Sequence, residues 1–563
     1  MGRKTERVFT KVSNIKEYME VLKSHGDKVL FRYPVGNQYE SMSYAQFYNQ
    51  VMDTAAGFAA LGLAGKRIAV IGPTAPEWVS SYLAVLVSGG VIIPMDKELD
   101  AVAIAGFLET AEAEAIVYGK GMKQKLAGAI ESHPTMKLFI PMENEEATDK
   151  ILPLSAVIEK GKAAQAEAPY PIHEGSTEEL AVMLFTSGTT GTAKCVMLCQ
   201  KNIWATLVSA CSTVEFFPDD TIVSVLPLHH TYELICMLSG MDYGHTIGIN
   251  DSLAHIMKNF AEYKPTGLVL VPLFITTMYN RIIAKAKSTG QDKKLRAGLK
   301  ISGALRKIGI DRRRKMFKSV LDAFGGRLCK IVSGAAPLNP EMVKAFDGFG
   351  ITIAEGYGIT ECSPLISVNP YYALKKGSVG PAVPCCKVRI DVREKNDKGY
   401  EEGEIQVKGD NVMLGYYKND EENKRAFTED GWYRTGDVGY MDKDGYIYIT
   451  GRLKSVIVLE NGKNVFPEEI EEYLSRIPEI GECVALGRKA EDGETVNLCV
   501  LVYPNTEIYG ETPDKEKAYE DINKKIIELN RQLPTFKKIK VLEIVDAPFE
   551  KTTTRKIKRH LVK

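Results

Sequence analysis

Apolar residues along this chain follow two alternating patterns. Short runs of four to six apolar residues are typical of buried strands, whereas apolar residues spaced three or four apart are typical of helices. Ser43 caps one helical segment, Tyr44–Phe58, and Pro76–Gly89 forms another. The apolar runs are Arg67–Ile71, Val91–Met95, Ala181–Phe185, Thr221–Leu226, Gly267–Val271 and Cys329–Val332, and each of the last four precedes a helical stretch. Near-continuous apolar strands separated by helices predict an α/β protein with mostly parallel sheets covered on both faces.

The pattern changes after about residue 376. Three segments, 387–393, 403–407 and 446–449, alternate polar and apolar residues between glycine-containing turns. Because this alternation is typical of antiparallel strands, we predict a small β-barrel-like subdomain over residues 377–450.

The pattern changes again after Gly451. The following unit comprises, in order, a strand at 456–459, a helix from Pro467 to about Ile477, strands at 483–487 and 498–503, and a charged helix over about Asp514–Gln532. We therefore predict two domains. The large N-terminal domain, residues 1–451, contains two mostly parallel sheets and the β subdomain, and a smaller mobile α+β domain occupies residues 452–563.

Composition narrows the class of protein. A length of 563 residues with 45% apolar residues predicts a globular protein of several structural units. No apolar run reaches the roughly 18 residues of a membrane span, and the charged start MGRKTERVF lacks the apolar core of a secretory signal. Ten scattered cysteines without a C-x-x-C pair indicate reduced thiols rather than a disulfide framework or a zinc site. We expect a cytoplasmic protein without a transmembrane segment.

Charge adds one exclusion. The 72 Lys and Arg residues balance 72 Asp and Glu residues, so no overall positive field would attract nucleic acid. The one strongly charged run, Arg306–Lys318, is interpreted as a solvated helix face. We expect no nucleic-acid partner, and peripheral contact with a membrane stays open.

The segment Leu184–Lys194 carries the strongest chemical signal. Positions 186 to 192 are only Thr, Ser or Gly and directly follow a buried strand. Such a loop can surround an anion with backbone N–H groups and hydroxyls, and Lys194 adds a positive charge. Its glycine spacing differs from that of a P-loop, and a flexible linker has a similar composition. A linker would not follow a buried strand directly, so we favour phosphate contact.

Two further glycine-rich turns follow apolar strands, where open α/β sheets bind ligands. These turns lie in the segments 332–338 and 355–361. In the second segment, the ring of Tyr357 could stack on a flat base. Glu361 is a hard oxygen ligand suited to Mg²⁺, and Thr360 offers a hydroxyl beside it. A tight surface turn with a solvated glutamate and no ligand would have the same sequence pattern.

Two later segments contribute charge. Asp437 lies in a glycine turn and could accept both hydroxyls of a ribose, with Arg452 near enough in sequence to bind phosphate. The basic tail Lys551–Lys558 is typical of a solvated terminus when taken alone.

These blocks, in this order, resemble the adenylate-forming superfamily of acyl-CoA synthetases, peptide-synthetase adenylation domains and firefly luciferase. The resemblance runs from about Ser43 to the C-terminus and includes Glu77-Trp78 and Pro94-Met95-Asp96. It implies ATP-dependent activation of a carboxylic acid to an acyl-adenylate with release of pyrophosphate. Transfer of the acyl group to CoA would then give acyl-CoA and AMP.

The resemblance also implies roles for individual residues. Lys556 would be the catalytic lysine of adenylation, Thr360 would contact the α-phosphate, Glu361 would bind Mg²⁺, and Lys454 would be the hinge between the domains. The nucleotide-binding residues would be Thr186, Ser187, Gly188, Thr189, Thr190, Gly191, Lys194, Ala335, Ala336, Glu355, Gly356, Tyr357, Gly358, Asp437 and Arg452. The cofactors implied are ATP and Mg²⁺, with CoA as co-substrate.

The sequence departs from the family pattern at four positions: Ala193, Cys195, Arg555 and Val458. Ala193 and Cys195 stand where Pro and Gly are typical, Arg555 replaces a Gly, and Val458 replaces a frequent Lys. Loss of glycine restricts the backbone. We therefore expect effects on loop mobility and rate rather than on the class of reaction.

The block Leu226-Pro-Leu-His-His-Thr-Tyr-Glu233 resembles long-chain acyl-CoA synthetases, in which the equivalent of His230 positions the carboxylate or gates the acyl pocket. Small residues such as Gly240, Gly303 and Gly334 would leave room for a chain. We therefore expect a medium- to long-chain fatty acid as substrate. The alternatives are an aryl or other acid, transfer to the phosphopantetheine of a carrier protein, or a nucleotide-binding protein without turnover.

Overall fold

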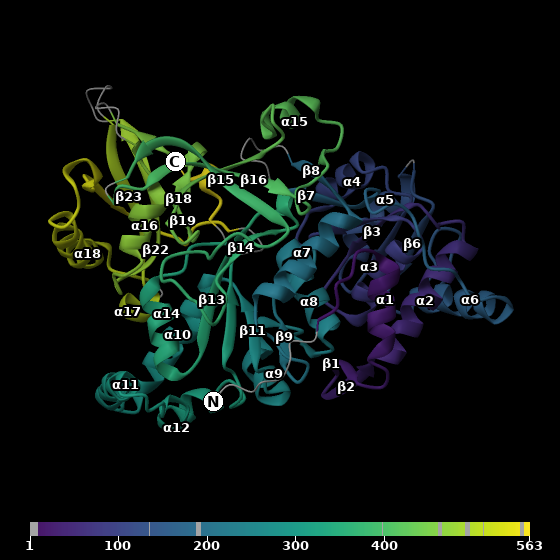
Figure 1. Cartoon of the computed structure of the whole chain (residues 1–563), viewed down its shortest axis with the longest axis horizontal. Coiled ribbons are helices and arrows are strands. Elements are labelled where there is room, and N and C mark those ends of the chain that lie inside the picture. The colour runs from purple at the N-terminus through teal and green to yellow at the C-terminus, as the bar shows by residue number, and fades with distance from the viewer. Residues whose placement is uncertain are drawn as a thin grey trace.

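The computed structural model describes residues 9–133, 135–186, 193–396, 398–459, 464–489, 496–510, 512–551 and 557–562. The chain forms two large sheets, a smaller antiparallel sheet and a C-terminal α+β unit (Figure 1). The strands of the two large sheets are interleaved along the sequence. This mixed α/β architecture, with a large N-terminal part built on mainly parallel sheets, confirms the predicted fold class.

The first large sheet has eight strands. Its six inner strands are parallel, and an antiparallel strand closes each edge. The order across the sheet is β14 (Leu365–Val368), β13 (Thr352–Gly358), β12 (Lys330–Ser333), β11 (Gly267–Leu270), β9 (Thr221–Ser224), β10 (Thr246–Ile249), β1 (Val29–Val35) and β2 (Gln38–Ser43).

The second large sheet has seven strands, of which the last five in the following order are parallel. That order is β17 (Gly415–Tyr416), β8 (Lys194–Cys199), β7 (Leu180–Thr186), β4 (Val91–Met95), β3 (Arg67–Ile71), β5 (Ala115–Tyr118) and β6 (Leu138–Pro141).

Helices fill the space between these sheets and cover their outer faces. The largest apolar core combines Ile68 of β3, Leu238 of α8 and Ile247 of β10, so both sheets share it. The capping box predicted at Ser43 is present at the start of α2. The helices up to residue 349 are α1 (Ile15–Ser24), α2 (Tyr44–Ala60), α3 (Pro76–Val87), α4 (Ala101–Thr110), α5 (Lys123–Ser132), α6 (Leu154–Glu167), α7 (Gln200–Thr213), α8 (Thr231–Tyr243), α9 (Ile256–Tyr263), α10 (Pro272–Ser288), α11 (Asp292–Lys307), α12 (Arg313–Met316), α13 (Lys318–Asp322) and α14 (Pro340–Phe349).

Residues 377–450 contribute most of a four-stranded antiparallel sheet. Its strands are β15 (Cys386–Lys395), β16 (Glu401–Gly409), β18 (Tyr433–Met441) and β19 (Ile447–Arg452), with α15 (Asp420–Ala426) between β17 and β18. The predicted antiparallel strands are confirmed, and a barrel-like closure stays a prediction.

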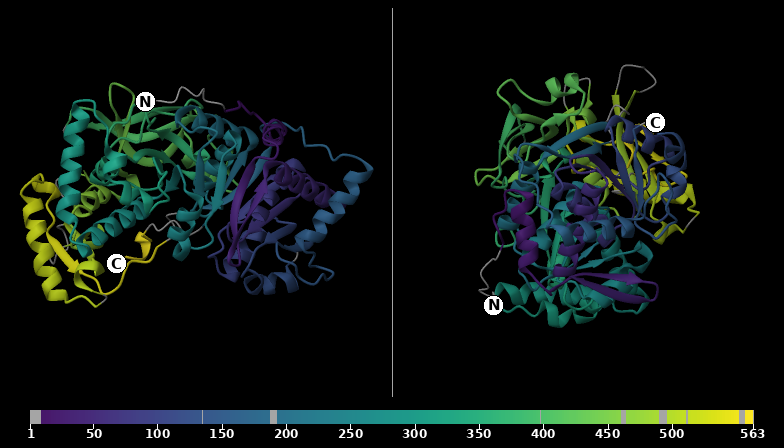
Figure 2. Two further views of the ribbon diagram at one scale, coloured as in Figure 1. Left: turned by 90° about the horizontal axis from the view of Figure 1, so that it is seen from below. Right: turned by 90° about the vertical axis from the view of Figure 1, so that its right-hand side faces the viewer.

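The C-terminal unit has an apolar core of its own. The buried side chains of that core all come from residues 457–539, as expected for a segment that folds around its own interior. The elements are β20 (Ile457–Val458), β21 (Asn464–Val465), α16 (Pro467–Leu474), β22 (Ile480–Lys489), β23 (Val496–Pro504), α17 (Thr506–Tyr509), α18 (Lys515–Asn530) and β24 (Val541–Ile544). Figure 2 shows this unit at one end of the long axis. We propose a domain boundary at residues 451–452.

Two expectations about local structure are wrong. The run Ala181–Phe185 is followed not by a helix but by β8, which pairs antiparallel with β7, because Cys195–Cys199 is itself an apolar run that fits the sheet. The charged run Arg306–Lys318 is not one helix face. It includes the end of α11, a turn at Gly309 with a φ of 79°, and the short helix α12.

All ten cysteines lie in the described segments, and none forms a disulfide, as expected. Within those same segments, no helix combines the length and apolar character needed to cross a membrane.

Helices α2 and α6 cross at two glycines, which generates a stability prediction. A Cβ atom on Gly161 of α6 would lie 1.7 Å from the carbonyl oxygen of Asp53 in α2. Gly161→Ala therefore forces the helices apart, and we expect it to lower the free energy of unfolding by about 3 kcal/mol. Gly106→Ala in α4 is the control, because a Cβ there meets nothing within 4 Å. This substitution should raise the free energy of unfolding by up to about 1 kcal/mol, since alanine favours the helix more than glycine does. Urea unfolding measures both, and equal midpoints for the two variants would contradict this packing.

Candidate functional site

The predicted phosphate loop joins the two strands of a β-hairpin. Thr186 at the end of β7 pairs with Lys194 at the start of β8, and the Thr186 hydroxyl donates to the Lys194 carbonyl over 3.5 Å. The hairpin therefore fixes both ends of the loop. Ser187, Gly188, Thr189, Thr190, Gly191 and Thr192 lie outside the described residues.

Tyr416 of β17 connects this hairpin to Glu361. The Lys194 ammonium forms an ion pair with Glu422 of α15 and lies 4.9 Å from the centroid of the Tyr416 ring. The Tyr416 hydroxyl donates to Glu361 Oε1 over 2.9 Å. One aromatic side chain thus contacts both the predicted phosphate-binding lysine and the predicted magnesium ligand. The sequence did not single out Tyr416, because a pair of tyrosines after a short apolar run carries no chemical signal.

Glu361 belongs to a short 3-10 helix, Thr360–Cys362, that follows β13. Its backbone carbonyl accepts from the Met413 N–H over 2.9 Å, so both its main chain and its side chain are anchored to the segment around β17. Thr360 precedes it directly. The structure therefore brings Thr360, Glu361 and Lys194 to one region around Tyr416.

The predicted adenine-binding residues lie at the carboxyl ends of β12 and β13. Ala335, two residues after β12, has a φ of 71°, a conformation that costs energy for a residue with a side chain and occurs often at functional sites. Ala336 follows it. Burial, with a smaller contribution from Glu472 of α16, raises the pKa of Glu355 to about 8. Glu355 is therefore mostly protonated at neutral pH.

Asp437 is a buried carboxylate with two partners. It is 4% exposed and accepts from the Tyr357 hydroxyl over 2.7 Å, while Arg452 Nε lies 2.9 Å from its other oxygen. The attraction of Asp437 raises the pKa of Arg452 further. Tyr357 is 7% exposed, so its ring is largely covered in this arrangement. Its hydroxyl is hydrogen-bonded to the Asp437 carboxylate. Gly356 and Gly358 flank it within β13.

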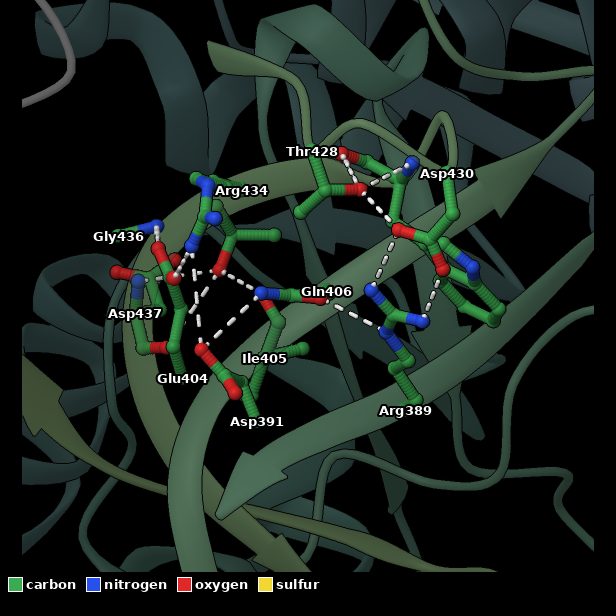
Figure 3. A network of polar contacts seen from close by, with 12 residues as sticks. Arg389, Asp391, Glu404, Ile405, Gln406, Thr428, Asp430, Arg434, Gly436 and Asp437 are labelled. Carbon is green, nitrogen blue, oxygen red and sulfur yellow. Dashed lines mark hydrogen bonds and ion pairs between the residues drawn. The ribbon is translucent and has the colours of Figure 1, made fainter. Parts of the chain in front are cut away.

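Glu404 of β16 supports the turn that carries Asp437. Its carboxylate accepts from the Gly436 N–H over 3.1 Å and from Arg434 Nη1 over 3.3 Å (Figure 3). Gly436 has a φ of 72°, so the turn depends on a conformation that glycine adopts without strain. Glu402, Glu404 and Gln406 share a strand face and are all buried, which the sequence pattern could not distinguish from a solvated face.

The predicted histidine lies at the start of α8. His230 is the N-cap residue of this helix, and its ring centroid lies 4.1 Å from that of His229. Burial lowers the pKa of His229 to about 3, so its ring is neutral. Glu233, one turn into α8, accepts from the Ser224 hydroxyl over 2.5 Å, and burial raises its pKa to about 8.

The remaining predicted residues lie away from this site or outside the described residues. Lys454 belongs to a 3-10 helix, Leu453–Ser455, directly after β19. Lys556 and Arg555 lie outside the described residues. Gly303 is exposed on α11, so it does not leave room in a buried pocket, and that expectation is wrong. At Gly334 a Cβ would lie 3.1 Å from the Tyr232 ring, so this glycine does permit close packing.

Two family models match this chain. The model described as AMP-binding enzyme matches residues 19–417, well over half of the sequence. The chain belongs to the AMP-binding enzyme family. A second model, AMP-binding enzyme C-terminal domain, matches residues 454–563.

Relatives of this AMP-binding enzyme share about three residues in ten with it. The long-chain-fatty-acid–CoA ligase FadD15 of Mycobacterium bovis is 29% identical over 485 residues, covering 82% of this chain and 78% of that protein. Long-chain-fatty-acid–CoA ligase 1 of Homo sapiens is 30% identical over 469 residues, covering 78% and 66%. Among solved structures, the adenylation domain of a carboxylate reductase from Mycobacterium chelonae superposes with a TM-score of 0.81 at 20% identity, covering 98% and 89%. That superposition supports the fold.

Glu404 generates a prediction for nucleotide binding by this AMP-binding enzyme. Glu404→Ala removes the acceptor of the Gly436 N–H and releases the Asp437 turn, so we expect about tenfold weaker AMP binding, close to 1.4 kcal/mol. Asp391→Ala is the matched control, because Asp391 is exposed at the edge of the same network and lies 3.8 Å from Arg434 (Figure 3). Isothermal titration with AMP measures both variants. Unchanged affinity in Glu404→Ala would show that the turn holds its shape without this carboxylate.

Proposed function

We propose that this chain is an AMP-forming acid–CoA ligase that activates a medium- to long-chain fatty acid. Its family membership and the names of its relatives support the chemistry. The single observation that carries the proposal for the acid is the similarity to long-chain-fatty-acid–CoA ligases. A small apolar cavity beside the candidate site agrees with it. ATP and CoA are the proposed co-substrates.

The cavity lies between the second large sheet and helices α3, α7 and α8. Its polar lining consists of Thr231, directly after His230, and Ser363, two residues after Glu361. Aliphatic and aromatic side chains form the rest, among them Tyr82, Leu184, Leu198, Ile203, Leu234 and Leu238. An acid bound with its carboxylate near Glu361 and His230 would extend its chain into apolar surroundings.

The cavity has a volume of about 20 Å³, less than one fatty acyl chain occupies. Binding of such a chain therefore requires the lining side chains of α8 to move. Burial of each methylene would stabilise the bound acid by about 0.8 kcal/mol, which favours longer chains until the cavity ends.

Adenylation needs charge neutralisation, because one anion attacks the α-phosphate of another. In the proposed mechanism Lys194 and the loop donors bind the terminal phosphates, and Lys556 approaches the reacting groups from the C-terminal domain. Glu361 fits a Mg²⁺ ligand, since Mg²⁺ in nucleotide sites is bound by one or two carboxylates and the phosphates. When bound, this ion would neutralise phosphate charge, while the Tyr416 hydroxyl holds the Glu361 carboxylate in position.

Ribose binding at Asp437 requires a rearrangement. Asp437 is only 4% exposed and contacts Tyr357 and Arg452, so a ribose would reach its carboxylate only if these neighbours shift. Arg452 lies two residues before the proposed hinge at Lys454. Rotation of the C-terminal domain about this hinge would change the surroundings of Arg452 and bring different neighbours to the acyl group for adenylation and for thioester formation.

One experiment separates this proposal from its alternatives. AMP and pyrophosphate release are measured with a panel of aliphatic and aryl acids, with and without CoA. We expect CoA-dependent AMP release that increases with aliphatic chain length. Highest activity with an aryl acid would change the substrate class, and adenylate without CoA thioester would favour a carrier-protein acceptor. No turnover with any acid would leave a nucleotide-binding protein without catalysis.

Lys556 generates a prediction for the two half-reactions. Lys556→Ala should abolish adenylation, because the lysine is proposed to neutralise charge only in that step, and should largely spare thioester formation from supplied acyl-adenylate. Lys558→Ala is the control, since Lys558 forms an ion pair with Glu550 at 3.6 Å. Rapid-quench measurement of both half-reactions tests this. Equal loss in both steps would refute the assigned role.

A further inference from the structure

A short part of the chain carries a dense positive charge. Residues 285–318 contain thirteen lysines and arginines but only two aspartates, a net charge of +11 within a chain whose net charge is zero. The segment comprises the end of α10, all of α11 and α12, and the start of α13. It belongs to the connection between the adjacent parallel strands β11 and β12, and Figure 1 shows α11 and α12 at the outer edge of the molecule.

Only some of these charges have partners within the protein. Arg306 and Arg313 pair with Asp347 at 2.5 and 2.7 Å, and Lys318 pairs with Asp322 at 2.7 Å. Arg314 donates to backbone carbonyls. Nine other basic residues are exposed and form no ion pair with any described residue: Lys285, Lys287, Lys293, Lys294, Arg296, Lys300, Lys307, Arg312 and Lys315. The local field is therefore not cancelled inside the protein.

The outer face of α11 combines this charge with apolar side chains. Lys293, Lys300 and Lys307 are seven residues apart and form one row along the helix, because seven residues make almost two turns. Ile301 and Ile308 each follow a lysine of this row by one residue, about a quarter turn away, and are 54% and 70% exposed. These five residues define what we call the α11 surface.

The opposite face of α11 packs against the protein. Leu299 contacts the position of Gly348 in α14, where an added Cβ would lie 2.6 Å from it, and Gly298 faces the ring of Phe317. The helix is thus held with the lysine and isoleucine rows outward. Packing in the protein core does not account for the isoleucines at positions 301 and 308, because their side chains are exposed.

We propose that the α11 surface docks onto an anionic lipid bilayer. Lysine rows attract acidic headgroups, and adjacent isoleucines can enter the boundary with the acyl chains while the lysines extend to the headgroups. Charge alone would suit nucleic acid equally well. The exposed isoleucines favour a lipid bilayer over nucleic acid, because apolar side chains add nothing to binding of a phosphate backbone. This binding requires no turnover and stands independently of the proposed ligase activity.

The test uses the full-length protein and vesicles of phosphatidylcholine with or without phosphatidylglycerol. We expect sedimentation with the anionic vesicles only, weakened by salt. The triple variant Lys293→Gln, Lys300→Gln, Lys307→Gln should bind about a hundredfold more weakly, at about tenfold for each 1.4 kcal/mol. The double variant Ile301→Ser, Ile308→Ser keeps the charge and should bind about tenfold more weakly.

The control variant changes three exposed lysines of α18: Lys517→Gln, Lys524→Gln and Lys525→Gln. It removes the same charge far along the chain from α11 and should bind like the unmodified protein. All variants change exposed positions, and urea unfolding verifies that each is folded. Equal loss in the control, or full binding by the isoleucine variant together with displacement by duplex DNA, would overturn the proposal in favour of general attraction to phosphate.

Discussion

A single buried carboxylate, Asp437, ties three parts of this protein together. Removing a charged group from water is costly unless hydrogen bonds and an opposite charge compensate for the loss. Tyr357 from the eight-stranded sheet and Arg452 from the end of the antiparallel sheet provide that compensation. Arg452 also leads into the C-terminal unit, because β19 ends at this residue. Asp437 therefore links the two sheets to the point where that unit begins.

The second large sheet organises the proposed phosphate end of the candidate site in a comparable way. Its β7–β8 hairpin presents Lys194, and β17 on the far side of β8 presents Tyr416 to both Lys194 and Glu361. β17 and β8 are more than two hundred residues apart in sequence, yet backbone hydrogen bonds fix their register. The site therefore rests on strand pairing within sheets, and the loop between β7 and β8 has rigid ends.

Charge is distributed unevenly in a chain that is neutral overall. The buried Glu233 and the half-buried Glu355 have pKa values raised to about 8 because their carboxyl groups are largely shielded from water. The surface near α11 instead gathers exposed lysines that form no ion pair with a described residue. Net charge describes neither region, since electrostatic effects on binding act within about a Debye length, roughly 10 Å at moderate ionic strength. The net charge of zero therefore excludes only an overall positive field around the whole protein.

The sequence by itself determined the elements and the family. Apolar periodicity located strands such as β3, β4 and β12 to within about two residues, and the ordered motifs identified an AMP-binding enzyme. It failed where a local pattern fits two structures. The apolar run after the glycine-rich loop became β8 rather than a helix, because an open sheet edge offered it backbone partners.

Only the tertiary structure decided which side chains meet. The sequence did not indicate the roles of Tyr416 and Glu404, since a tyrosine beside another tyrosine and a glutamate on an alternating strand belong to no recognisable motif. Their contacts with Glu361 and with the Asp437 turn arise from strand register between distant segments. Likewise the charged run at residues 306–318 looked like one solvated helix, and the break at Gly309 with the packing of α11 against α14 determined which charges remain outward. Local pattern specifies local structure, whereas long-range pairing specifies the site.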